Sequence, residues 1–211
     1  MKKNIKEFYE KLDTLFPQPK CELEYKSVYE LLVAVILSAQ CTDKRVNIVT
    51  KELFKDYDTP EKMLTLSQEE LESKIHSCGF YHNKAKNILS MSKDLLKKFN
   101  GEVPNDIEKM QTLAGVGRKT ANVVYSEAFK GNAIAVDTHV LRVSNRLGFV
   151  KTDSPLKCEL ALMKLFDEDK WGKLHLQLVH FGRYICKATK PDCVNCPFTS
   201  QCTYYATHNS I

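Results

Sequence analysis

Four cysteines near the C-terminus constrain the fold of this 211-residue chain more than any other feature. They follow the spacing C-x6-C-x2-C-x5-C, and prolines at positions 191 and 197 bend the chain between them. Four thiolates so close in sequence can surround one tetrahedral centre, either a zinc ion or an iron–sulfur cluster. The spacing differs from the paired short knuckles of a zinc ribbon, which favours the cluster, and disulfides are the remaining alternative. The candidate ligands are Cys186, Cys193, Cys196 and Cys202.

The rest of the chain points to an intracellular protein. The N-terminus carries no apolar stretch like that of a signal peptide, and the longest apolar run, residues 31–37, is too short to span a bilayer. We therefore expect a cytoplasmic protein with reduced thiols and no membrane partner. The net charge of +5 suits a polyanionic partner without proving one.

Apolar residues recur with helical spacing along almost the whole chain, and no segment alternates convincingly with the period of a strand. The fold class is therefore expected to be all-α. The periodicity and the start and stop signals predict helices over or near residues 5–15, 28–39, 46–54, 67–79, 83–99, 107–113 and 171–185. Further helices are expected to begin near residues 60, 118, 138 and 155.

Residues 107–124 form a distinctive pattern, in which a short helix is followed by Gly-Val-Gly and then at once by a second helix. Gly115 and Gly117 allow positive φ and a close approach to a ligand. The N–H groups at the new helix start, together with Arg118 and Lys119, predict an anion site. This is typical of a helix-hairpin-helix, which grips one DNA backbone without reading bases. The alternative is a plain helical turn closed by a glycine.

Two further residues have side chains suited to catalysis. Lys119 lies in the first turn of the second helix, where it could act as an amine nucleophile or contact phosphate, and the pattern alone favours the phosphate contact. Asp137 follows the apolar residues 133–136, so it could cap the next helix or present a carboxylate to Lys119 in a cleft. By itself the pattern favours the cap. A packing role is favoured for His139.

Together these motifs resemble the endonuclease III family of bifunctional DNA glycosylases and abasic-site lyases, within the helix-hairpin-helix glycosylase superfamily. The resemblance extends from about residue 29 to residue 202. Its most specific parts are the four cysteines and the segments at residues 37–43 (LSAQCTD), 115–124 (GVGRKTANVV), 136–139 (VDTH) and 180–183 (HFGR).

The resemblance implies that Lys119 is the nucleophile, that Asp137 is the essential carboxylate and that the four cysteines hold a [4Fe–4S] cluster. It implies duplex DNA carrying damaged bases or abasic sites as the partner. Gln40 matches the residue that enters the gap left by an extruded nucleotide. Phe80 stands where a leucine is common and could wedge between bases. Ala114 stands where a proline is usual, so a slightly looser hairpin is expected.

The family fold implies two lobes with a cleft between them for Lys119 and Asp137. Residues 22–130 would form a six-helix barrel with the hairpin, and residues 1–21 with 131–211 a helical domain with the cluster. The cluster is expected to be structural and to present Lys187 and Lys190 to phosphate, and His139 is counted among the DNA contacts. We expect a monomer that works on DNA in the nucleoid.

The implied function is base-excision repair of oxidised pyrimidines such as thymine glycol, through a lysine Schiff base and strand cleavage 3′ to the lesion by β-elimination. Three alternatives stay open. An adenine-specific monofunctional relative usually lacks the hairpin lysine and has a further C-terminal domain. A thymine-mismatch glycosylase of similar size is the second, and a DNA-binding module without activity is the third.

Overall fold

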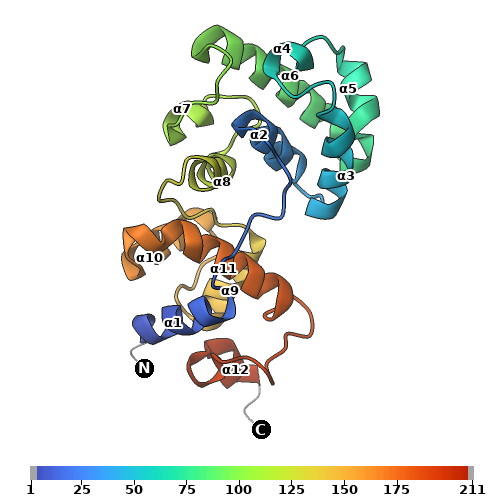
Figure 1. Cartoon of the computed structure of the whole chain (residues 1–211). Coiled ribbons are helices and arrows are strands. Elements are labelled where there is room, and N and C mark those ends of the chain that lie inside the picture. Colours follow the sequence, from blue (N-terminus) through green and yellow to red (C-terminus); the bar gives the residue numbers. More distant parts are fainter. Residues whose placement is uncertain (1–3, 209–211) are drawn as a thin grey trace. The chain divides into compact units, whose positions relative to one another are not determined.

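The computed structural model describes residues 4–208, and within them it is all-α with no β-strand, which confirms the predicted fold class. The helices are shown in Figure 1. The α-helices are α1 (Ile5–Leu15), α2 (Val28–Leu37), α3 (Asp43–Leu53), α4 (Pro60–Met63), α5 (Gln68–Ile75), α6 (Tyr81–Phe99), α7 (Ile107–Gln111), α8 (Arg118–Ala128), α9 (Thr138–Leu147), α10 (Pro155–Leu165), α11 (Trp171–Tyr184) and α12 (Thr203–His208), and the 3₁₀ turns are η1 (His76–Cys78), η2 (Glu168–Lys170) and η3 (Thr199–Gln201).

The chain divides into two compact units with separate apolar cores. One unit is Cys21–Gly131, and the other joins Met1–Lys20 to Asn132–Ile211, of which residues 4–20 and 132–208 are described. The first is called the hairpin unit below, and the second the cysteine unit. The lobe borders expected from the sequence lie at 22 and 130, and the assignment of these units as functional domains stays a prediction. Among the described residues, no helix is long and apolar enough to cross a membrane.

The hairpin unit is built around α2. Nine of the ten residues of this helix, all but Val28, are buried. The helix packs against α3, α6 and α8 (Figure 1), so apolar side chains on every face find a neighbour. Ser27 caps its start by accepting the Glu30 N–H, and the helix ends at Leu37, two residues before the predicted end.

Local capping signals fix the next helices. Thr59 caps α4 with Pro60 in its first turn, as the sequence predicts. Ser67 and Glu70 form the predicted capping box at the start of α5. Helix α6 begins at Tyr81, two residues before the predicted start, because the break between helices falls at Gly79 and Phe80, which both have positive φ.

Aromatic rings dominate the core of the cysteine unit. The ring of Phe8 on α1 packs against Phe149, Phe166 and Phe198, with centroid separations of 4.8, 6.1 and 4.5 Å. Phe198 belongs to the four-cysteine segment, and it also meets Phe181 of α11 at 5.3 Å. The segment is therefore anchored to the core by a fully buried ring, independently of any metal.

Candidate functional site

The hairpin consists of α7, a turn over residues 112–117, and α8. Gly115 has φ +76°, and a Cβ atom built there would lie 2.9 Å from Cβ of Asn87 on α6. Only glycine can adopt this positive φ and also leave the space that Asn87 occupies free. Gly117 differs from expectation, because its φ is −84° and a Cβ atom would meet nothing within 4 Å. The prediction of positive φ was therefore correct for Gly115 and wrong for Gly117, which starts α8 in an extended conformation.

The start of α8 is exposed and has no side-chain cap. Gly117 is the N-cap and supplies no side-chain hydrogen bond to the first turn. Arg118 and Lys119 are the first two residues of the helix, and both are exposed. The N–H groups of a first turn have no partner within their helix, and the dipole makes this end attractive to anions. The hairpin therefore offers a phosphate-sized anion both backbone N–H groups and side-chain charge.

Buried residues hold the two hairpin helices together. Leu113 and Val116 in the turn are buried, as are Met110 on α7 and Ala121 on α8. Ala121 is fully buried, which fits the small residue needed where the helices pack. Ala114, the position where the family usually has a proline, is half-buried.

Asp137 is the N-cap of α9, in the cysteine unit. Its Oδ1 accepts the Val140 N–H at 2.8 Å, and the carboxylate is half-buried. The four residues before it, 133–136, are all buried and fix the chain that delivers it. The capping interpretation is thus correct, and it leaves a charged side chain at a rigid position that is still in contact with solvent.

The positions matching the family's gap-filling residues lie on two loops of the hairpin unit. Gln40 follows α2, is exposed and has φ +54°. Phe80 precedes α6, has φ +49° and is 64% exposed. A non-glycine residue in the left-handed region is strained by about 1–2 kcal/mol, and such strain concentrates at binding sites. The two residues therefore share a left-handed backbone and an exposed side chain.

His139 packs within the cysteine unit. Its Nδ1 atom lies 3.2 Å from an Nη atom of Arg142, and a Cβ atom built at Gly182 of α11 would lie 2.9 Å from its own Cβ. These contacts support the packing role that the sequence favours. A DNA contact for His139 stays a prediction.

The four cysteines follow α11 and are half-buried, and all are free thiols. Burial, with the nearby Cys186 and Cys202, raises the pKa of Cys193. Burial, with the other three thiols, raises the pKa of Cys196 to about 11. Among residues 4–208, no three Cys, His, Asp or Glu side chains are disposed to hold a single metal ion. Four free thiols within 17 residues nevertheless match an iron–sulfur donor set in chemistry, and the ligand assignment stays a prediction.

Two arginines of α9, which the sequence analysis missed, secure the start of the cysteine segment. Arg142 donates to the carbonyl oxygens of Gly182 and Cys186 at 2.9 and 3.2 Å. Arg146 donates to the carbonyls of Lys187 and Ala188 at 2.6 and 2.9 Å, and its Nη1 lies 3.5 Å from Sγ of Cys186. Burial lowers the pKa of Arg142. No sequence signal links these arginines to a segment some 40 residues away, because their acceptors are backbone carbonyls.

The segment also carries the two lysines expected to meet phosphate. Lys187 and Lys190 are exposed, and Lys190 has φ +49°. At the other end of the segment, the Cys202 thiol lies 3.3 Å from the Arg146 carbonyl, and the Arg146 guanidinium lies over the Tyr204 ring of α12. Helix α9 therefore contacts both ends of the four-cysteine segment.

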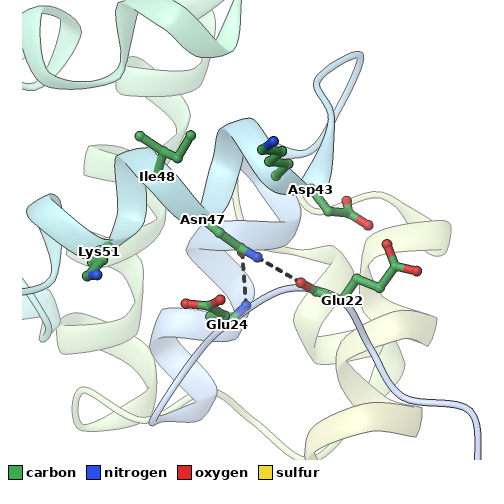
Figure 2. Close-up of a pocket in the computed structure, with 7 residues that line it drawn as sticks. Glu22, Glu24, Asp43, Asn47, Ile48 and Lys51 are labelled. Carbon is green, nitrogen blue, oxygen red and sulfur yellow. Dashed lines mark hydrogen bonds between the residues drawn. The ribbon is translucent and has the colours of Figure 1, made fainter.

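A pocket of about 390 Å³ on the hairpin unit is lined by none of the predicted site residues. Figure 2 shows Asn47 of α3 at its centre, donating to the Glu22 carbonyl and accepting the Glu24 N–H. The acidic and basic side chains around it are mixed, with Asp43 and Lys51 on the same helix. The pocket therefore favours neither an anion nor a cation, and Asn47 fastens the chain entering α2 to α3.

Comparison with known proteins decides the family. The model of the HhH-GPD superfamily of base excision DNA repair proteins matches residues 33–168. Endonuclease III of Bacillus subtilis (strain 168) is 50% identical over 201 residues, covering 95% of this chain and 92% of that protein. This chain belongs to the endonuclease III family. It is therefore a base-excision repair enzyme, a DNA glycosylase and abasic-site lyase, and the predicted family is confirmed.

Solved structures of endonuclease III match over nearly the whole chain. A non-covalent endonuclease III–DNA complex is 48% identical, with a TM-score of 0.95 and coverage of 98% of this chain and 97% of that one. A trapped endonuclease III–DNA covalent intermediate is also 48% identical, with a TM-score of 0.94 and coverage of 98% and 99%. The matched structures include the family in its DNA-bound and covalently trapped states.

Proposed function

We propose that this enzyme removes oxidised or ring-saturated pyrimidines, such as thymine glycol, from duplex DNA and then cleaves the strand 3′ to the abasic site. One observation carries the chemical part of the proposal: Lys119 is exposed in the first turn of an uncapped helix that follows Gly115 and Gly117. An amine placed where the hairpin binds phosphate can reach the sugar of the same nucleotide.

The first task is to hold one DNA strand. The uncapped N–H groups of α8 and the charge of Arg118 receive a backbone phosphate. Gly117 has open space around its Cα, so the phosphate can approach the main chain closely. Lys187 and Lys190 on the cysteine segment, with His139, add contacts with the DNA backbone.

The second task is to bring the damaged base out of the helix. A base inside a duplex cannot be reached, so the nucleotide must be flipped, and lesions that stack poorly cost less to flip. Gln40 enters the gap that is left, and the exposed ring of Phe80 wedges between neighbouring bases. Ring-saturated pyrimidines such as thymine glycol have a non-planar ring and stack weakly, which favours them as substrates.

The third task is chemical. The neutral amine of Lys119 forms a bond to C1′ while the bond from C1′ to the base breaks, and the base leaves with the electron pair and a proton. Asp137 stabilises the positive charge that develops on the sugar and helps to move protons. Opening of the sugar gives a protonated Schiff base, which acidifies C2′. Loss of a C2′ proton then expels the 3′ phosphate by β-elimination.

The four cysteines Cys186, Cys193, Cys196 and Cys202 would hold a [4Fe–4S] cluster. When bound, the cluster supplies structural cross-linking and no redox step in turnover. It would keep the segment that carries Lys187 and Lys190 in one conformation. We propose a monomer that acts on chromosomal DNA in the cytoplasm.

Substrate choice is tested with three duplexes that differ at one position: thymine glycol opposite adenine, thymine opposite guanine, and an undamaged thymine–adenine pair. Release of the base and nicking should occur on the first and not on the other two. Release of thymine from the mismatch, with thymine glycol untouched, would reject the proposal in favour of a thymine-mismatch glycosylase. Binding without release on any of these duplexes would mean that the enzyme acts on another class of lesion.

A further inference from the structure

A buried lysine lies near the start of α6. Within the described part of the chain, its side-chain amine donates hydrogen bonds to main-chain carbonyl oxygens only. Lys84 is 5% exposed. Its Nζ donates to the carbonyls of Leu37, Ala39 and Cys78 at 2.8, 2.7 and 2.8 Å. An ammonium has three hydrogens, so these three bonds use its full donor capacity.

The three carbonyls belong to the two loops that carry Gln40 and Phe80. Leu37 is the last residue of α2, and Ala39 directly precedes Gln40. Cys78 ends the turn η1, and only Gly79 separates it from Phe80. The buried Lys84 ammonium therefore links the main chain of both loops within the hairpin unit.

The position is an unfavourable one for a lysine. Burial lowers the pKa of Lys84, since the charged form loses its water. The neighbouring Cys78 thiol, whose pKa burial raises to about 11, stays protonated at neutral pH and gives no counter-charge. The compensation comes from the three carbonyl dipoles. One of them, the Leu37 carbonyl, is at the C-terminus of α2, where carbonyls lack partners inside the helix and the helix dipole is negative. Burying an apolar side chain here would cost less desolvation free energy, so the charge indicates a specific role for Lys84 in joining the loops.

We propose that Lys84 is a positioning residue that fixes the separation of Gln40 and Phe80, so that both can enter the DNA at once. This inference rests on the gap-filling roles given to those residues in the proposed function. Each loop has a left-handed non-glycine residue within two positions of a carbonyl that Lys84 holds. Without the three bonds, these strained loops relax independently of one another. Displacement by about 1 Å is enough to cost about a hundredfold in a process that depends on fit.

The test measures how strongly the enzyme prefers DNA with a gap over intact DNA. A general loss of protein stability does not change this preference. Binding is compared between a duplex containing tetrahydrofuran, a stable abasic analogue, and the same duplex intact. The preference is the ratio of the two Kd values. It is measured for wild type, Lys84→Met, Gln40→Ala/Phe80→Ala and the triple variant. Lys93→Met removes an exposed lysine of the same helix and serves as the matched control.

Lys84→Met should lower the preference about tenfold in the wild-type background and by less than about twofold in the Gln40→Ala/Phe80→Ala background, because it acts through those two side chains. Lys84→Arg, which keeps charge and donors, should recover part of the loss. Lys93→Met should behave as wild type. Equal losses in both backgrounds would overturn the proposal, as would a wild-type protein with no preference for the gap.

Two precautions keep the result decisive. Thermal melting of each variant shows whether it is folded at the assay temperature. If Lys84→Met fails to fold, Lys84→Gln replaces it, because its amide retains two of the donors. Neither Kd depends on strand cleavage, so failure of the lyase chemistry and failure of the positioning role give different results.

Discussion

At the scale of single residues, Asp137 shows how one side chain serves two purposes. Its Oδ1 caps α9 at 2.8 Å from the Val140 nitrogen, which is a structural role that asparagine also performs. Its proposed catalytic role needs the negative charge, which asparagine lacks. The cap and the charge can therefore be separated by substitution.

Asp137→Asn should change the free energy of unfolding by less than about 1 kcal/mol. It should lower the single-turnover rate on an abasic duplex by about a hundredfold or more. Asp137→Ala should lose the rate and also about 1 kcal/mol of stability, since no cap remains. Urea denaturation and quenched nicking assays measure the two quantities.

Asp106 provides the matched control. It caps α7 in the same way, accepting the Lys109 N–H at 2.9 Å, and it is half-buried like Asp137. Asp106→Asn should leave both stability and rate nearly unchanged. A full rate in Asp137→Asn would show that the charge is not needed and would contradict the proposed role.

At the scale of elements, the hairpin uses its two glycines for different physical reasons. Gly115 is required by the fold, because its φ is +76° and a Cβ atom there would lie 2.9 Å from Cβ of Asn87. Gly117 is not required by the fold, because its backbone suits any residue and its surroundings are open. The absence of a side chain at Gly117 therefore matters only for a ligand that approaches the backbone from solvent.

Gly115→Ala should therefore destabilise the protein by more than about 1 kcal/mol. Gly117→Ala should leave the melting temperature unchanged while weakening binding to duplex DNA about tenfold, or about 1.4 kcal/mol. Calorimetry and fluorescence anisotropy measure these effects. Unchanged DNA affinity in Gly117→Ala would mean that no phosphate approaches the main chain there.

Local signals explain which elements the sequence predicts. The cap at Thr59 with Pro60 and the box of Ser67 and Glu70 are contained in a few neighbouring residues, so they can be read directly. Helix α12 was not predicted, because it has six residues and no buried face. It is in contact with α9, where the Arg146 guanidinium lies 4.4 Å from the centre of the Tyr204 ring.

At the scale of the whole molecule, the sequence motifs identify the family. The contacts that hold these motifs in place cannot be read from the sequence. Lys84 and Arg142 act on backbone carbonyls up to 47 residues away, and a carbonyl carries no sequence signature. Such contacts emerge only when the chain is folded. The same limit applies to Phe198, whose role in the aromatic core cannot be read from its position between two cysteines.

The cysteine segment is held by Phe198, Arg142 and Arg146 as well as by the proposed cluster. Cys196→Ser should therefore remove the cluster, lower the melting temperature by several degrees and weaken DNA binding. The rate of the chemical step at saturating enzyme should stay within about threefold of wild type, since Lys119 lies in the other unit. Iron analysis, melting and single-turnover kinetics check this. A cluster-free protein with full stability and tight binding would contradict it.

The central claim is that Lys119 forms a covalent bond with the sugar of the damaged nucleotide. Borohydride reduces a Schiff base to a stable amine, so it traps the enzyme on its DNA. Wild type should form an adduct with both a thymine glycol duplex and an abasic duplex, and Lys119→Gln should form none while still binding DNA. Release of thymine glycol by the wild type without any adduct would contradict the claim and leave Lys119 as a phosphate contact.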